Sequence, residues 1–305
     1  MRLKPPGLCA EPVLPSVRPS ISCLVTKPAA HSEFFFQGTH TRIGVFDSGL
    51  GGLSILKALH ERLPLADLTY IADSGNAPYG ERDDGFIATR SKDICDHLIA
   101  TSVDAIVVAC NTATAAAIHL LREAYPGLPI IGVEPGVKPA VAQSVTKRIG
   151  VLATPSTLAS DKYKRLIETH GHGATIVSQA CPGLAKEIES GQLDTPALRD
   201  LIARFAAPLR QADVDTVVLG CTHYPFVAPL FQQALSEQVN IVDTAKAVTE
   251  HTARLCALKP GRHSGHTKPI TSTGKLRFCT SADPAHLATV VYNWLGVSCD
   301  VSRLN

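Results

Sequence analysis

The 305-residue chain lacks several features that would mark particular protein classes. Its formal net charge is only +2, with 29 Lys and Arg against 27 Asp and Glu, so charge does not favour a nucleic-acid or acidic-membrane partner. No apolar run approaches the roughly 18 residues that a membrane-spanning helix needs. The nine cysteines include neither a Cys-x-x-Cys pair nor a Cys/His cluster with zinc spacing. These absences predict a reduced, cytoplasmic protein with no metal site.

The first 41 residues differ in composition from the rest. They are rich in Pro and Ser, and their only acidic residues are Glu11 and Glu33. Such a segment buries little surface, so we expect residues 1–41 to form a disordered extension. A transit-like targeting segment, which is also Ser-rich and poor in acids, is the alternative.

From Arg42 onward, short apolar runs alternate with longer helical patterns. This alternation is typical of βαβ units that build a parallel sheet. The runs lack polar alternation, as expected for strands covered on both faces. The predicted strands are Ile43–Phe46, Leu68–Ala72, Ala105–Ala109, Ile130–Val133, Ile149–Ala153, Thr216–Gly220 and Ile241–Asp243.

Three of these segments occur twice. Arg42–Phe46 returns 106 residues later as Arg148–Leu152, and Val103–Cys110 returns 111 residues later as Val214–Cys221. Pro129–Ile131 matches Asn240–Val242 at the same offset of 111. We therefore predict an α/β fold of two pseudo-symmetric, mainly parallel-sheet domains with the active site in the cleft between them. The first domain would comprise residues 42–134 plus 243–305, and the second residues 135–242.

Each half ends one buried strand in a cysteine. Cys110 and Cys221 are both followed by polar residues where a helix should begin, and the positive end of a helix dipole lowers the pKa of a thiol. Asn111, Thr112 and Thr222 could cap these helices or bind a ligand, and their place in the cleft favours the ligand. Four other cysteines are expected to be inert: Cys95, Cys256, Cys279 and Cys299.

A glycine-rich turn, Asp47–Gly52, joins the first strand to the helix predicted over Leu53–Leu63. Free N–H groups at a helix start bind anions. Ser54 stands where a Gly-x-Gly-x-x-Gly dinucleotide motif needs its last glycine, so a small carboxylate is the better ligand. Asp47 offers a carboxylate beside the first thiol. A second loop, Asp73–Arg82, has turn composition, and its contact with ligand stays open.

These segments resemble a known family. Asp47–Gly52, Pro78–Gly80, Ala109–Thr112 and Gly220–Pro225 are similar to the characteristic segments of the glutamate racemases, which are cofactor-independent enzymes. The resemblance runs in order from Arg42 to about Gly296. It implies reversible interconversion of L- and D-glutamate, which supplies D-glutamate for peptidoglycan. It implies no cofactor, glutamate as the small-molecule partner and no nucleic acid or membrane, and a homodimer stays open.

The resemblance also implies roles for individual residues. Cys110 and Cys221 would be the catalytic thiols, with Asp47 assisting the first and His223 the second. Glu189 would be the acid beside the second thiol, although Glu187 lies close by in the sequence. The substrate would be held by Asp47, Ser48, Tyr79, Gly80, Asn111, Thr112, Thr222 and His223.

The proposed chemistry explains why two thiols are present. Inverting a stereocentre removes the α-proton from one face and delivers a proton to the other, so one thiol acts as base and the other as acid. A cysteine hydrolase would need only one nucleophile and a base. An aspartate racemase is a further alternative, but His223 favours glutamate. A non-catalytic amino-acid-binding protein on the same fold is another.

Overall fold

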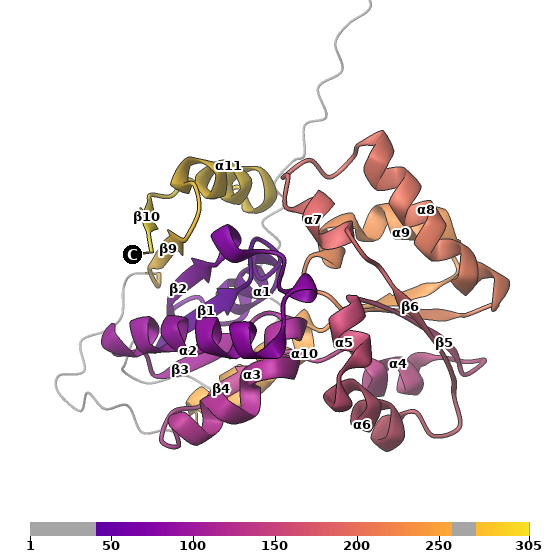
Figure 1. Ribbon diagram of the computed structural model, residues 1–305, viewed down its shortest axis with the longest axis horizontal. Helices are drawn as coiled ribbons and strands as arrows, with labels where there is room; N and C mark the ends of the chain where they lie inside the picture. The colour runs from indigo at the N-terminus through magenta and orange to yellow at the C-terminus, as the bar shows by residue number, and fades with distance from the viewer. Residues whose placement is uncertain (1–40, 258–272, 305) are drawn as a thin grey trace, which may run out of the picture. The chain divides into compact units, whose positions relative to one another are not determined.

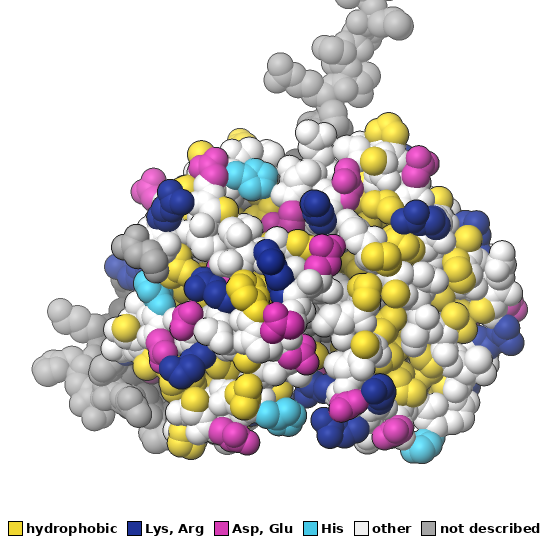
Figure 2. All heavy atoms as spheres, in the orientation of Figure 1, with side chains coloured by type: hydrophobic (Ala, Val, Ile, Leu, Met, Phe, Trp, Pro, Cys, Tyr) yellow, Lys and Arg dark blue, Asp and Glu magenta, His cyan; other side chains and the backbone are white. Residues whose placement is uncertain are grey.

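The computed structural model describes residues 41–257 and 273–304. The predicted disordered extension therefore lies outside the described residues, apart from Thr41. No helix within the described ranges is both long enough and apolar enough to cross a bilayer. Figure 2 shows acidic and basic side chains interspersed on the face in view, in keeping with the near-zero net charge.

The first sheet has the strand order β10-β9-β2-β1-β3-β4 in the described residues, and every pairing is parallel. Its strands are β1 (Arg42–Asp47), β2 (Asp67–Ala72), β3 (Ala105–Val108), β4 (Ile130–Gly132), β9 (Leu276–Thr280) and β10 (Val301–Arg303). One face packs on α1 (Leu53–Arg62), α10 (Ala245–Ala257) and α11 (Pro284–Leu295). The other face packs on α2 (Asp84–Ala100) and α3 (Asn111–Ala124) (Figure 1).

The second sheet has the order β6-β5-β7-β8, again with parallel pairing throughout. Its strands are β5 (Arg148–Ala153), β6 (Thr175–Ala180), β7 (Thr216–Leu219) and β8 (Asn240–Val242). On one face lie α4 (Val137–Gln143), α5 (Pro155–Ala159) and α6 (Asp161–His170). On the other lie α7 (Leu184–Ile188), α8 (Pro196–Gln211) and α9 (Ala228–Leu235). Three short 3-10 turns complete the elements: η1 (Ser74–Asn76), η2 (Tyr79–Glu81) and η3 (Tyr224–Val227).

The α/β class with mainly parallel sheets is confirmed, and all seven predicted strands form within two residues of their expected bounds. The prediction missed β6, β9 and β10, because these strands are partly exposed and carry polar residues among the apolar ones. The chain passes from the first sheet to the second between β4 and β5 and leaves the second after β8. The exact domain boundaries stay a prediction.

The sequence repeat has a structural reason at its glycine. Gly44 in β1 lies directly under Leu98 of α2, and a Cβ added there would come within 2.8 Å of the leucine Cδ1. Gly150 in β5 has the same relation to Leu209 of α8, also at 2.8 Å. The two leucines are 111 residues apart, the same offset as two of the three repeated segments, whereas the two glycines are 106 apart, the offset of the third. Each half therefore needs a glycine where a helix packs closely onto its first strand.

We expect Gly150→Val to lower the free energy of unfolding by about 1–3 kcal/mol, because the added methyl groups overpack the contact with Leu209. Chemical denaturation measures the change. Leu209→Ala should cost less stability in this variant than in the wild type, since it removes the clashing side chain there. Gly127→Val, where a Cβ meets no atom within 4 Å, is the control. Equal losses in Gly150→Val and Gly127→Val would contradict the packing explanation.

Candidate active site

The two predicted catalytic thiols lie at matching strand ends of the two sheets. Cys110 follows β3 by two residues and Cys221 follows β7 by two residues. Both side chains are buried, and they are close enough for charge on one thiol to act on the other. The repeat therefore brings two thiols to one place from opposite halves, as predicted.

Cys110 is the N-cap residue of α3. Its Sγ accepts a hydrogen bond from Ala113 N at 3.4 Å and lies 3.6 Å from Ser48 Oγ, to which it can donate. Burial nevertheless raises the pKa of the Cys110 thiol to about 12, and the charge of Asp47 raises it further. The prediction that the helix start lowers this pKa is wrong, because desolvation outweighs the hydrogen bond from the helix N–H group.

Asp47 ends β1 between the two halves. Its Oδ1 accepts a hydrogen bond from Gly49 N at 2.7 Å, and its Oδ2 accepts one from Thr222 Oγ1 of the second half at 2.9 Å. Ser48 Oγ lies 3.5 Å from the Asp47 carboxylate, so this serine stands between Asp47 and the Cys110 thiol. Burial raises the pKa of Asp47 to about 6, although the neighbouring His223 lowers it.

The second thiol has a different set of neighbours. Cys221 precedes a 3-10 turn, η3, where the sequence predicted a helix start. Its Sγ lies 3.6 Å from His223 Nδ1, and His223 Nε2 hydrogen-bonds to Glu189. Burial lowers the pKa of His223, but the contacts with Cys221 and Glu189 outweigh burial and raise it well above its usual value. The contacts with the thiol and the carboxylate thus favour the protonated form of the imidazole.

The structure distinguishes the two glutamates that the sequence left open. Glu189 contacts His223 and also accepts a hydrogen bond from Leu50 N at 2.5 Å. Glu187 instead lies 3.5 Å from the Thr195 hydroxyl. Of the pair, Glu189 is thus the one that reaches the neighbourhood of the second thiol.

The glycine-rich turn after β1 allows close approach by side chains of the other half. A Cβ on Gly49 would lie 2.1 Å from Glu189 Oε1, and one on Gly51 would lie 2.3 Å from His223 Nδ1. The sequence predicted close approach by a ligand carboxylate at this turn, whereas here the carboxylate belongs to Glu189. Tyr70 Oη donates a 2.6 Å hydrogen bond to Gly49 O and supports the turn from β2.

The remaining predicted residues form a second group on the side of Cys110. Thr112 Oγ1 lies 3.1 Å from Thr154 Oγ1 across the halves, and a Cβ on Gly80 would meet Thr154 at 3.1 Å. Asn111 is buried, and its Nδ2 has no hydrogen-bond partner among the described residues. The hydroxyl of Tyr79 donates to Asp73 and is thus committed to the protein.

Several residues at the site were not predicted. Ser54 Oγ lies 3.0 Å from Thr222 O and 2.9 Å from Gly51 O, linking the halves behind the thiols. Tyr70 and Thr154 also contact predicted site residues. The sequence carries no signal that separates Tyr70 from an ordinary core aromatic, since it lies inside a buried strand. For Thr154, its place after the repeated strand was the available signal.

One group of side chains has the composition of a cation site. Ligand atoms of Asp47, Glu189 and His223 lie within 4.8 Å of one another. Each already has a hydrogen-bond partner, since Thr222 donates to Asp47 and Glu189 bonds to His223. The three therefore suit proton transfer and charge compensation as they stand.

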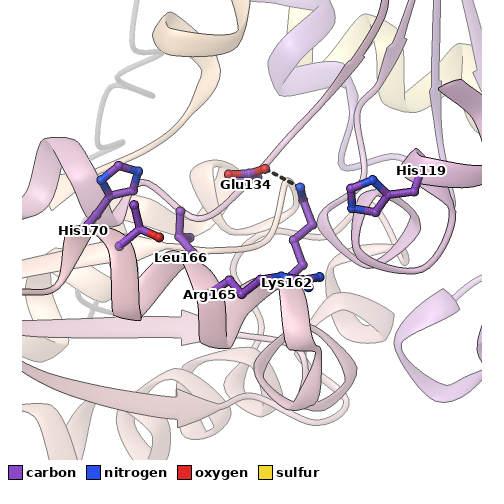
Figure 3. A pocket seen from close by; sticks show the side chains of 7 residues that line it. His119, Glu134, Lys162, Arg165, Leu166 and His170 are labelled. Carbon is purple, nitrogen blue, oxygen red and sulfur yellow. Dashed lines mark ion pairs between the residues drawn. The ribbon is translucent and has the colours of Figure 1, made fainter. Parts of the chain in front are cut away.

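A separate cavity of about 290 Å³ lies on the surface between α3 and α6 (Figure 3). Lys162 in this cavity forms a 2.6 Å ion pair with Glu134. His119, Arg165 and His170 also line it. None of the predicted site residues lines this cavity, so it is distinct from the thiol pair.

Comparison with known proteins relates the whole described arrangement to one group of enzymes. A family model for Asp/Glu/hydantoin racemases matches residues 53–252. The glutamate racemase of Herpetosiphon aurantiacus is 45% identical over 248 residues, which cover 81% of this chain and 95% of the relative. That of Ralstonia nicotianae is 42% identical over 263 residues, covering 86% and 92%.

Solved structures agree. A glutamate racemase isoform from Bacillus anthracis superimposes with a TM-score of 0.77 at 32% identity, covering 87% of this chain and 98% of that one. Escherichia coli glutamate racemase, in complex with L-glutamate and the activator UDP-MurNAc-Ala, gives 0.77 at 27% identity with the same coverage.

The raised pKa of Asp47 predicts a measurable pH dependence of stability. Between its unfolded pKa of 3.8 and its folded pKa of about 6, the folded protein keeps a proton that the unfolded chain has lost. Stability from this group is therefore present at low pH and falls as pH rises through this window, by roughly 3 kcal/mol in total. Asp47→Asn removes the titration, so its free energy of unfolding relative to wild type should increase from pH 4 to pH 6.

Denaturant unfolding at several pH values tests this expectation. Ser48→Ala is the matched control, because it changes the same turn and keeps the carboxyl group. A constant difference between Asp47→Asn and wild type across the window would show that Asp47 is not the shifted group.

Proposed function

Because the chain belongs to the glutamate racemase family, we propose that it interconverts L- and D-glutamate by proton transfer at Cα between Cys110 and Cys221. The main support is the placement of two buried thiols at matching strand ends of the two halves. A hydrolase would use one of them and leave the other without a role. An inversion needs both.

The two thiols have different partners for handling the proton. On the first side, Ser48 stands between Cys110 and the Asp47 carboxylate. On the second side, His223 contacts Cys221 directly and is held by Glu189. We assign Asp47 to accepting and returning the proton of Cys110, and the protonated His223 to donating a proton to the Cys221 thiolate and taking it back. Glu189 orients the imidazole. The thiol that begins protonated acts as the acid, and the roles exchange when the reaction runs backward.

The α-proton of an amino acid is only weakly acidic, so the site must stabilise negative charge that develops at the substrate carboxylate and Cα. Preorganised hydrogen-bond donors serve this purpose in a site that excludes water. The buried Nδ2 of Asn111 is one unpaired donor beside Cys110. The hydroxyls of Ser48, Thr112 and Thr222, with the loop Tyr79–Gly80, complete the group that we assign to the substrate. None of these assignments involves a cofactor.

Family membership supports glutamate as the substrate, and its D-enantiomer would be used in peptidoglycan synthesis. We place the reaction in the reducing cytoplasm, because all the cysteines among the described residues are free thiols and two of them must stay so. A homodimer and independence from nucleic acid stay predictions.

Incubating L-glutamate with the purified protein in D₂O, without added pyridoxal phosphate or metal, tests the function. We expect D-glutamate to form and to carry deuterium at Cα, because the thiol that reprotonates the substrate obtains its proton from solvent. The recovered L-glutamate should carry little label at low conversion, since the base stands on the other face. Chiral chromatography with mass spectrometry measures both, and L-aspartate should react far more slowly.

Three results would count against the proposal. Activity that depended on added pyridoxal phosphate would exclude the cofactor-independent route. Equal rates with aspartate would exclude glutamate specificity. Substantial protium in the first D-glutamate would indicate one base acting on both faces.

Cys110→Ser and Cys221→Ser should each reduce racemisation by about 100-fold or more, because a serine hydroxyl is too weak an acid to replace the thiol in proton transfer. Steady-state rates from circular dichroism measure the loss. Cys95→Ser is the control, since Cys95 is a buried thiol in the α2 core, away from the strand ends. If either catalytic variant kept more than a tenth of wild-type activity, that thiol would not be an obligatory acid or base.

A further inference from the structure

The loop from Asp73 to Arg82 contains a buried carboxylate that the proton-transfer scheme does not use. Asp73 follows β2 directly, and its side chain is fully shielded from solvent. A carboxylate in such a place is stable only if hydrogen bonds and a positive charge compensate for the lost water.

Three side chains from three elements, α2, η1 and η2, supply this compensation. Arg90 of α2 approaches both carboxylate oxygens of Asp73, at 2.9 and 3.2 Å. Tyr79 Oη donates at 2.5 Å, and Asn76 Nδ2 donates at 3.0 Å. Burial raises the pKa of Asp73, but the hydrogen bonds from Arg90 and Tyr79 outweigh burial and hold it below its usual value. Asp73 is thus an ionised carboxylate that holds the loop through the hydrogen bonds from Asn76 and Tyr79.

The part of the loop that is bonded to Asp73 also contacts the candidate site. Tyr79 is buried in the same hydrophobic cluster as Cys110. The next residue, Gly80, lies against Thr154, which itself contacts Thr112. A shift of this 3-10 turn would therefore move the wall of the site beside the first thiol.

We propose that Asp73 and Arg90 are positioning residues, which hold the Tyr79–Gly80 turn where glutamate binds. This inference rests on the proposed function. Because the Tyr79 hydroxyl is bonded to Asp73, Tyr79 contributes its ring and backbone to the substrate, and its hydroxyl acts on the protein. Arg90 makes no contact with the thiols and influences binding only through Asp73 and the turn.

A double-mutant cycle on glutamate kinetics tests the inference. Tyr79→Phe removes only the hydroxyl, and Arg90→Gln removes the charge. Each should raise KM for glutamate by about fivefold or more and leave kcat within about threefold, because the turn binds substrate and transition state alike. The double variant should be no more than about twofold worse than the more affected single variant, since both act through Asp73.

Lys92→Gln is the matched control, because Lys92 lies on the same helix and pairs with Asp96 on the surface. It should keep wild-type KM and kcat. Arg90→Lys keeps the charge and should recover part of the lost affinity. If Arg90→Gln does not fold, Tyr79→Phe alone decides: wild-type KM in that variant overturns the inference.

Other results also overturn it. Effects that multiply in the double variant would mean that the two residues act separately, and a fall in kcat at constant KM would place Tyr79 in the chemical step. Wild-type KM in both single variants, with an active wild-type protein, overturns the positioning role and leaves the proposed function intact. An inactive wild-type protein overturns both.

Discussion

One buried carboxylate, Asp47, and one partly buried carboxylate, Glu189, share one imidazole at the centre of this protein, and the surrounding structure depends on that arrangement. Asp47 and Glu189 come from different halves, and His223 lies within 4.8 Å of both. Two negative groups this close together would repel each other, and a protonated imidazole beside both offsets that repulsion. Burial raises the pKa of Asp47, and the charge of Glu189 adds to that rise, whereas the contacts with Cys221 and Glu189 raise the pKa of His223 against the effect of burial. The two thiols thus lie beside groups whose pKa values the surrounding protein has already raised.

The two halves share a sequence pattern but differ in the groups that surround their thiols. Both have a glycine under a helix leucine in the first strand and a cysteine two residues after a later strand. The first thiol caps an α-helix and has a carboxylate nearby, whereas the second precedes a 3-10 turn and has an imidazole nearby. A symmetric scaffold therefore presents two unequal thiols, which fits a reaction whose substrate has two different faces.

The sequence predicted those parts of the fold that depend on local pattern and on the repeat. The buried strands without polar alternation were predicted to within two residues of their observed bounds. In contrast, β6 and β9 were missed because partial exposure breaks their apolar runs. The positions of Cys110 and Cys221 at strand ends were also predicted correctly. Properties that depend on three-dimensional burial could not be predicted: the pKa of Cys110 reflects desolvation, and the choice of Glu189 over Glu187 reflects the direction of a short helix. The sequence identified Asp73 only as part of a turn, because its partner Arg90 lies in the helix that follows, α2.

The burial of both thiols has a consequence for the rate of turnover. Hydrogen bonds between Thr222 and Asp47, and between Leu50 and Glu189, close the halves over groups that a solvent molecule barely reaches. Because Cys110 and Cys221 are only 6% and 7% exposed, glutamate can bring its Cα between the two sulfurs only if the two halves move apart. Each catalytic cycle thus contains an opening and a closing, and the overall rate cannot exceed the frequency of that motion, however fast the protons move.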